Sequence, residues 1–106
     1  MADARARPVM TVLEGSVPEG RWDELVRAFE AGGSRRPAPL LRSYLVQDTA
    51  DRTRFRLIGV WRCRAALEEY RKSVATPGGV LMFRSVGVEP VLSMGEVAAA
   101  GPALES

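Results

Sequence analysis

Hydrophobic positions change their period within residues 55–79, and this change predicts a buried strand followed by an amphipathic helix. Residues 55–61 are rich in β-branched and aromatic side chains between flanking arginines, which is typical of a strand inside a sheet. The next apolar residues recur at helical spacing, at Cys63, Ala66, Leu67, Tyr70 and Val74. Pro77, Gly78 and Gly79 then end the helix. Trp61 and Tyr70 are therefore expected in one layer between sheet and helix.

The rest of the chain divides into three more strands and one long helix. Apolar alternation predicts strands over residues 9–17, 40–48 and 91–97. A helix that opens at Pro18 and ends at Gly32 carries apolar residues at helical offsets, at Trp22, Leu25, Val26 and Phe29. Residues 34–39 are expected as a surface loop, and residues 48–52 as a hairpin turn. For residues 80–86 we favour a short helix ended by Gly87, with a strand as the alternative.

This order of elements predicts an α+β fold of the ferredoxin-like βαββαβ class, with one four-stranded antiparallel sheet. The 106 residues are enough for one domain, which we place at residues 8–97. Residues 1–7 are expected to be a disordered tail and residues 98–106 a flexible C-terminal tail.

Apolar residues occupy both faces of the predicted central strands. In residues 40–48, strict alternation puts Leu41 and Leu45 on one face and Leu40, Tyr44 and Val46 on the other. Two helices of this length cover only one face of a sheet, so something else must cover the second. The simplest candidate is a second copy of the chain related by two-fold symmetry. We therefore predict a homodimer whose sheets meet face to face.

Composition and charge exclude several classes of partner. The formal net charge is only +2, and the arginines are scattered, with Lys72 the sole lysine, so no nucleic-acid partner is expected. Cys63 is the single cysteine, which allows no internal disulfide and no thiolate metal site and fits a reducing cytoplasm. No apolar run approaches the length of a membrane span, and the polar N-terminal stretch lacks the apolar core of a signal peptide. We expect a cytoplasmic protein without membrane contacts.

The run LIGVWRCRAALEEYRKS, followed by TPGGVLMFRSVGVEP, resembles the antibiotic biosynthesis monooxygenase (ABM) family of the dimeric α+β barrel superfamily. The resemblance covers residues 9–97. It implies a homodimer with a pocket between sheet and helices in each subunit. In some members it also implies oxygenation of polyketide-type aromatics without metal, flavin or haem, so no cofactor is expected. We therefore expect a monooxygenase-like tailoring enzyme acting on an anthrone or hydroquinone. The alternatives are a non-oxidative cyclase or isomerase and a non-catalytic ligand-binding dimer.

The same resemblance nominates two catalytic residues. Trp61 matches the strand-ending tryptophan of the family, and Tyr70 matches an aromatic position on the following helix. Family oxygenases also use an asparagine, but the chain has none, and Gln47 is the only amide available. Other members degrade haem with a histidine ligand. This chain contains no histidine, and the corresponding position falls near Val80, so haem chemistry is not expected.

Six further residues are candidates for binding a flat aromatic substrate. They are Tyr44, Arg56, Met82, Phe83, Arg84 and Met94. An arginine offers a planar, permanently charged fork to a phenolate or carboxylate, and methionine and phenylalanine form a pliable apolar lining. Each nominated residue also has a structural interpretation, as a core side chain or a surface ion pair. The face of the sheet on which Tyr44 lies depends on the hairpin register, which the sequence leaves open.

Overall fold

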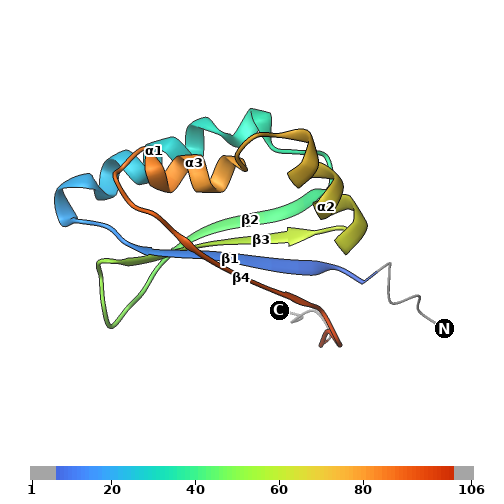
Figure 1. Cartoon of the computed structure of the whole chain (residues 1–106). Helices are drawn as coiled ribbons and strands as arrows, with labels where there is room; N and C mark the ends of the chain where they lie inside the picture. The colour runs from blue at the N-terminus through green and yellow to red at the C-terminus, as the bar shows by residue number, and fades with distance from the viewer. Residues whose placement is uncertain (1–6, 102–106) are drawn as a thin grey trace.

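The computed structural model describes residues 7–101, apart from the side chain of Ser34, as one sheet with helices on one of its faces (Figure 1). The elements are, in chain order, β1 Val9–Ser16, the 3₁₀ turn η2 Glu19–Arg21, α1 Trp22–Ala31, the 3₁₀ turn η3 Gly33–Arg35, β2 Leu40–Gln47, β3 Arg54–Trp61, α2 Arg64–Ser73, α3 Gly78–Arg84 and β4 Val91–Glu96. The tails predicted for residues 1–7 and 98–106 lie largely outside the described residues.

The sheet has the strand order β2-β3-β1-β4, and every neighbouring pair is antiparallel. This order and the sequence of elements confirm the ferredoxin-like α+β fold. All three helices lie on the same face of the sheet, with α1 and α3 side by side and α2 beyond the end of β3 (Figure 1). No helix within residues 7–101 combines the length and the apolar character that a membrane crossing requires.

Most predicted elements are confirmed, with differences at their ends. The segment predicted as a short helix is α3, and Gly87 follows it with a φ of 79°, a left-handed conformation that glycine adopts without strain. The second long helix is shorter than its sequence pattern, because α2 ends at Ser73 and Val74 is already extended. Residues 34–39, predicted as a surface loop, begin inside the 3₁₀ turn η3.

One prediction for β2 was wrong. Strict alternation placed Leu40 with Tyr44 and Val46, but the pairing with β3 has a bulge between Leu40 and Arg42. A bulge inserts one extra residue and reverses the alternation on one side of it. As a result Leu40 points to the helix side, together with Leu45, while Leu41 is exposed.

Two groups of buried side chains hold the helices on the sheet. The larger group lies beneath α1 and α3 and consists of Leu13, Val17, Leu25, Phe55, Phe83 and Val86. The smaller group lies beneath α2 and consists of Val9, Trp61 and Leu67, with Leu40 and Tyr70 packed against it. Phe83 and Leu25 are fully buried, so the larger group is the best-packed part of the domain.

The other face of the sheet is apolar and is covered by no element of the described residues. Leu13 is buried beneath the helices, so its neighbour Val12 points to the opposite face, in register with Ile58 and then Tyr44. We call this surface the open face. Its apolar side chains are Met10, Val12, Tyr44, Val46, Ile58, Val60 and Val91. The structure thus confirms that both faces of the sheet carry apolar residues.

Replacing Phe83 with alanine should lower the free energy of unfolding by about 3–5 kcal/mol, because it leaves a cavity in the best-packed part of the core. Leu81→Ala on the same helix is the matched control. That side chain is 54% exposed, so its loss should cost less than about 1 kcal/mol. Urea unfolding followed by circular dichroism measures both. Equal losses in the two variants would contradict the assignment of Phe83 to the core.

Candidate functional site

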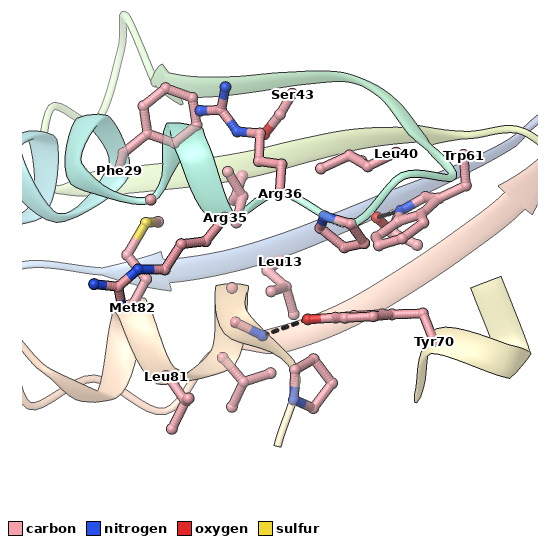
Figure 2. Close-up of a pocket in the computed structure, with 18 of the residues that line it drawn as sticks. Leu13, Phe29, Arg35, Arg36, Leu40, Ser43, Trp61, Tyr70, Leu81 and Met82 are labelled. Carbon is pink, nitrogen blue, oxygen red and sulfur yellow. Dashed lines mark hydrogen bonds between the residues drawn. The ribbon is translucent and has the colours of Figure 1, made fainter. Parts of the chain in front are cut away.

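A cavity of about 460 Å³ lies between the helix side of the sheet and the three helices (Figure 2). Strand residues form its floor, and residues of α1, α2, α3 and the segment after α1 form its walls. Most of the lining is apolar, including Leu13, Phe29, Leu40, Leu57, Leu67, Val80, Leu81, Met82 and Leu92. Its volume falls in the range of pockets that bind small molecules, and its lining suits a flat apolar molecule.

Trp61 and Tyr70, the two predicted catalytic residues, meet in the wall of this cavity. Their rings are stacked, with centroids 5.3 Å apart and an angle of 29° between the planes. The Trp61 indole N–H donates to Thr11 Oγ1 at 3.0 Å. The indole lies over Gly59, where a Cβ atom would come within 3.0 Å of Trp61 Nε1 and 2.9 Å of Thr11 Oγ1. Trp61 is therefore held firmly, and its N–H already has a partner inside the protein.

The Tyr70 hydroxyl remains a donor. It accepts a hydrogen bond from the backbone N–H of Gly78 at 3.0 Å, across the start of α3 (Figure 2). Because the phenol oxygen uses a lone pair in this contact, its own proton is left for another acceptor. Tyr70 is only partly buried and lines the cavity, so a ligand can supply that acceptor. The N–H of Gly78 also keeps the hydroxyl in place.

Sequence reasoning missed two hydroxyl groups in the floor of the cavity. Thr11 and Ser43 both line it. Thr11 Oγ1 accepts from Trp61, which leaves its proton free to donate. In the strand predicted over residues 9–17, alternation puts Thr11 on the same face as Leu13, so the sequence pattern did indicate this residue. Ser43 carried the same signal, because it alternates with Leu45 on one face of β2 and the bulge lies before it.

Three arginines of the lining were also missed by sequence reasoning. Arg35 and Arg36 come from the segment after α1, and Arg71 comes from α2. The Arg36 guanidinium lies over the Phe29 ring, 4.6 Å from its centroid, in a cation–π contact. No carboxylate of residues 7–101 lines the cavity. The polar groups here are hydroxyls and guanidiniums, so the site stabilises negative charge and offers no strong base.

Of the six residues predicted to bind substrate, Met82 alone lies in the described lining. Tyr44 is on the open face, because its register partner is Ile58. Phe83 is fully buried in the larger core group. Met94 is level with Thr11 but lies on the edge strand β4, half exposed.

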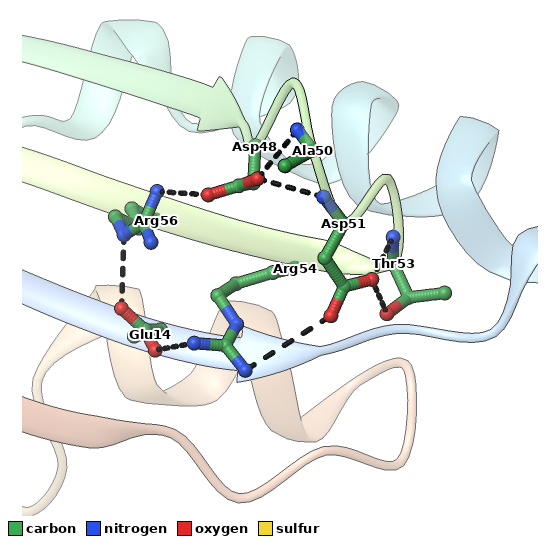
Figure 3. A network of polar contacts seen from close by, with 7 residues as sticks. All are labelled: Glu14, Asp48, Ala50, Asp51, Thr53, Arg54 and Arg56. Atoms are coloured by element: carbon green, nitrogen blue, oxygen red, sulfur yellow. Dashed lines mark hydrogen bonds and ion pairs between the residues drawn. The ribbon is translucent and has the colours of Figure 1, made fainter.

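Both arginines that the sequence nominated for an anion are occupied elsewhere. Arg84 is exposed and pairs with Glu89 at 2.8 Å. Arg56 lies on the open face, where it donates to Glu14 Oε1 at 2.9 Å and to Asp48 Oδ2 at 3.0 Å (Figure 3). Arg54 also pairs with Glu14, at 3.2 Å. Neither Arg56 nor Arg84 lines the cavity.

Asp48 is the most strongly stabilised carboxylate of this polar network. The backbone N–H groups of Asp51 and Ala50 both donate to its Oδ1 at 2.8 Å, and Arg56 donates to Oδ2 (Figure 3). These hydrogen bonds, with the contact from Asp51 the largest, lower the pKa of Asp48 from 3.8 to about 2. The hairpin turn between β2 and β3 is thus fixed by a charged side chain.

The described residues offer no cluster for a metal ion. No three side chains of histidine, cysteine, aspartate or glutamate come together within residues 7–101. Cys63 is a free thiol just before α2. Val80, the position that the resemblance assigns to a haem ligand, lines the cavity with an aliphatic side chain. Together with the absence of histidine from the whole chain, this lining does not fit haem.

Comparison with known proteins identifies a family for this chain and solved structures that share its fold. The family model described as antibiotic biosynthesis monooxygenase matches residues 8–76. A candidate antibiotic biosynthesis monooxygenase from Deinococcus radiodurans superposes with a TM-score of 0.69 and 16% identity, over 92% of this chain and 99% of that one. A heme-degrading protein from Mycobacterium tuberculosis superposes with a TM-score of 0.69 and 20% identity, also over 92% of this chain and 99% of that one. Such identities show a common fold alone. No curated protein sequence matches the chain.

Replacing Asp48 with asparagine should destabilise the protein at neutral pH but not at strongly acidic pH. The folded-state pKa lies below the ordinary value, so the charged form is stabilising above pH 3.8, and the contribution is lost as pH falls toward about 2. Asparagine keeps an acceptor for the turn but loses the charge. Urea unfolding of both proteins across this range measures the difference.

Glu69→Gln is the control for this series, because it removes a carboxylate from an exposed position of α2 that makes no ion pair within residues 7–101. Its effect should be small at every pH. A deficit in Asp48→Asn that stays constant down to pH 2 would contradict the assigned pKa.

Proposed function

Since the chain belongs to the antibiotic biosynthesis monooxygenase family, we propose that it is a cofactor-independent tailoring enzyme that oxygenates a polyketide-type aromatic of the anthrone or hydroquinone class. A monooxygenase-like or ligand-binding role is the general statement that the family supports. One observation carries the narrower proposal. The cavity is apolar, of small-molecule size, and its polar groups are donors that stabilise an oxyanion.

The proposed reaction needs an ionised substrate. An anthrone that has lost a proton is rich enough in electrons to pass one to dioxygen directly. Joining of the two radicals forms a carbon–oxygen bond, and loss of water leaves a carbonyl. The methylene carbon of the anthrone loses two hydrogen atoms and gains one oxygen atom of dioxygen. The second oxygen atom leaves as water, so atoms and electrons balance without a reductant.

The protein's part in this reaction is to hold and stabilise the anion. Arg35, Arg36 and Arg71 give the cavity positive charge, which lowers the pKa of a bound acidic carbon or phenol. With no carboxylate in the described lining, the proton passes to water at the mouth of the cavity. Tyr70 donates its free proton to the oxygen on which charge develops, from a position fixed by Gly78.

The same donors support a second candidate function. A hydroxyl and a guanidinium that face a carbonyl also polarise it, which a cyclase or isomerase requires. The indole N–H of Trp61 is already bound to Thr11, so in either reaction the donors are the Tyr70 hydroxyl and the guanidiniums. A non-catalytic ligand-binding dimer would use the same cavity without any of these steps. Oxygen consumption separates the three.

We also propose that the chain forms a homodimer through its open face. Members of this family typically form homodimers. The open face is the apolar surface that such pairing covers, and exposed apolar areas of this kind on a sheet mark an interface. The single free thiol of Cys63 is consistent with the cytoplasmic location that the sequence predicts.

Tyr70→Phe should lower the rate of oxygen uptake with an anthrone by about 100-fold, because it removes one donor to the developing oxyanion and keeps the ring stacked on Trp61. The chain has only one other tyrosine, so Tyr44→Phe makes the identical change on the open face and should keep the rate. An oxygen electrode and labelled dioxygen traced into the product measure both variants.

Three outcomes of this experiment would count against the proposal. Equal rates in the wild type and in Tyr70→Phe would remove Tyr70 from the reaction. Absence of uptake above the spontaneous rate across a panel of anthrones and hydroquinones would favour the non-oxidative or binding function. A larger loss of oxygen-uptake rate in Tyr44→Phe than in Tyr70→Phe would indicate that the reaction takes place at the open face.

Ile58→Glu should convert a homodimer into a monomer, because it would bury a charge at the centre of the open face. Val26→Glu on the exposed side of α1 makes the same change outside that face and should leave the dimer intact. Size-exclusion chromatography with light scattering gives the masses, and circular dichroism checks the fold. A monomeric wild type, or a monomeric Val26→Glu, would contradict pairing through the open face.

A further inference from the structure

The three arginines of the cavity have no ion-pair partner among the described residues. Five other arginines, Arg21, Arg54, Arg56, Arg64 and Arg84, form ion pairs with nearby carboxylates. Within residues 7–101 no such pair includes Arg35, Arg36 or Arg71. Three cations unpaired among these residues, in the lining of an apolar cavity to which the same residues contribute no carboxylate, make the cavity a site for an anion.

We propose that these arginines bind an oxyanion substituent of the ligand, so that the cavity selects a planar aromatic carrying a carboxylate or an ionised hydroxyl. This inference rests on the proposed function and specifies its substrate class. The apolar lining recognises the ring system, and the guanidiniums recognise the charge. A neutral aromatic of the same shape satisfies only the first of these requirements.

The cavity has two chemically different ends. Figure 2 shows Arg35 and Arg36 beside Phe29 and Met82, with Trp61 and Tyr70 on the other side of the cavity. Apolar residues such as Leu13 lie between these ends. A flat molecule that spans the cavity therefore has one edge next to the guanidiniums of Arg35 and Arg36 and the other next to the Tyr70 hydroxyl. The anionic substituent sets the orientation, and the oxygen that reacts faces Tyr70.

Arg36 is prepared for this role by its contact with Phe29. The guanidinium lies 4.6 Å from the ring centroid, and this contact limits the side chain's rotation. A guanidinium stacked on an aromatic ring keeps its N–H edge available for a carboxylate, which accepts two parallel hydrogen bonds from it. The entropy lost when an anion binds is smaller for such a side chain than for a freely moving one.

The size of the effect follows from the exposure of the arginines. All three side chains belong to exposed residues, so each attraction is weakened by water and by salt. We expect each arginine to improve the affinity for an anion by about threefold, and the Arg35 and Arg36 pair together by about tenfold. High salt should reduce this preference and leave the binding of a neutral aromatic unchanged.

The test uses two probes of one shape, anthraquinone-2-carboxylate and anthraquinone-2-carboxamide, whose dissociation constants are measured by equilibrium dialysis at low and high salt. The proteins are the wild type, the double variant Arg35→Gln/Arg36→Gln, and Arg71→Gln. Arg52→Gln is the matched control, since it removes one arginine from the exposed β2–β3 turn outside the cavity lining. Thermal unfolding of each variant checks that the fold is kept.

The inference predicts that the wild type prefers the carboxylate by about thirtyfold. The double variant should lose most of this preference, Arg71→Gln part of it, and Arg52→Gln none, with the carboxamide bound alike by all. Equal affinity for both probes, no binding of either, or a preference unchanged in the double variant would overturn the inference. Preferred binding of the carboxylate without oxygen uptake from any anthrone would keep the anion site and remove the oxygenase function.

Discussion

The fixed position of the Trp61 indole is the constraint on which the cavity depends. The ring is held over Gly59 by its hydrogen bond to Thr11, and Tyr70 stacks on its outer side. This stack, worth about 1 kcal/mol beyond the buried area, sets where α2 lies on the sheet. The Tyr70 hydroxyl then accepts a hydrogen bond from the backbone N–H of Gly78 and so positions the start of α3. One tryptophan thus determines the relative places of two walls of the site.

The chemistry of the cavity is decided by what its walls can donate. Hydroxyl and guanidinium groups stabilise an anion, and an apolar lining strengthens that effect because it excludes water from the reacting atoms. A site of this composition favours a substrate that supplies its own reactivity once ionised. In the proposed oxygenation, the protein then needs no strong base, because its part is to bind and stabilise the anion.

The sequence predicted what short-range periodicity determines and failed where distant segments meet. Strand and helix spacing placed Trp61 and Tyr70 together correctly, because both belong to one continuous strand–turn–helix unit. The pairing of Arg56 with Glu14 was beyond prediction, because it depends on the register of two strands separated by 42 positions. Leu40 was assigned to the wrong face because a bulge leaves no mark in the pattern. Arg35 and Arg36 were missed because a turn has no period to read.

The location of Arg35 and Arg36 has a consequence for how this scaffold can diverge. They lie at the end of η3, in the connection between α1 and β2, and not within a packed element. Surface connections tolerate substitution and changes of length far better than cores do. The charge at one end of the cavity can therefore be altered by mutation without repacking the sheet or the helices. If these arginines select the ligand as proposed, that part of the ligand preference is encoded apart from the packed core, and descendants of one ancestral protein can acquire new substrates while they keep the same fold.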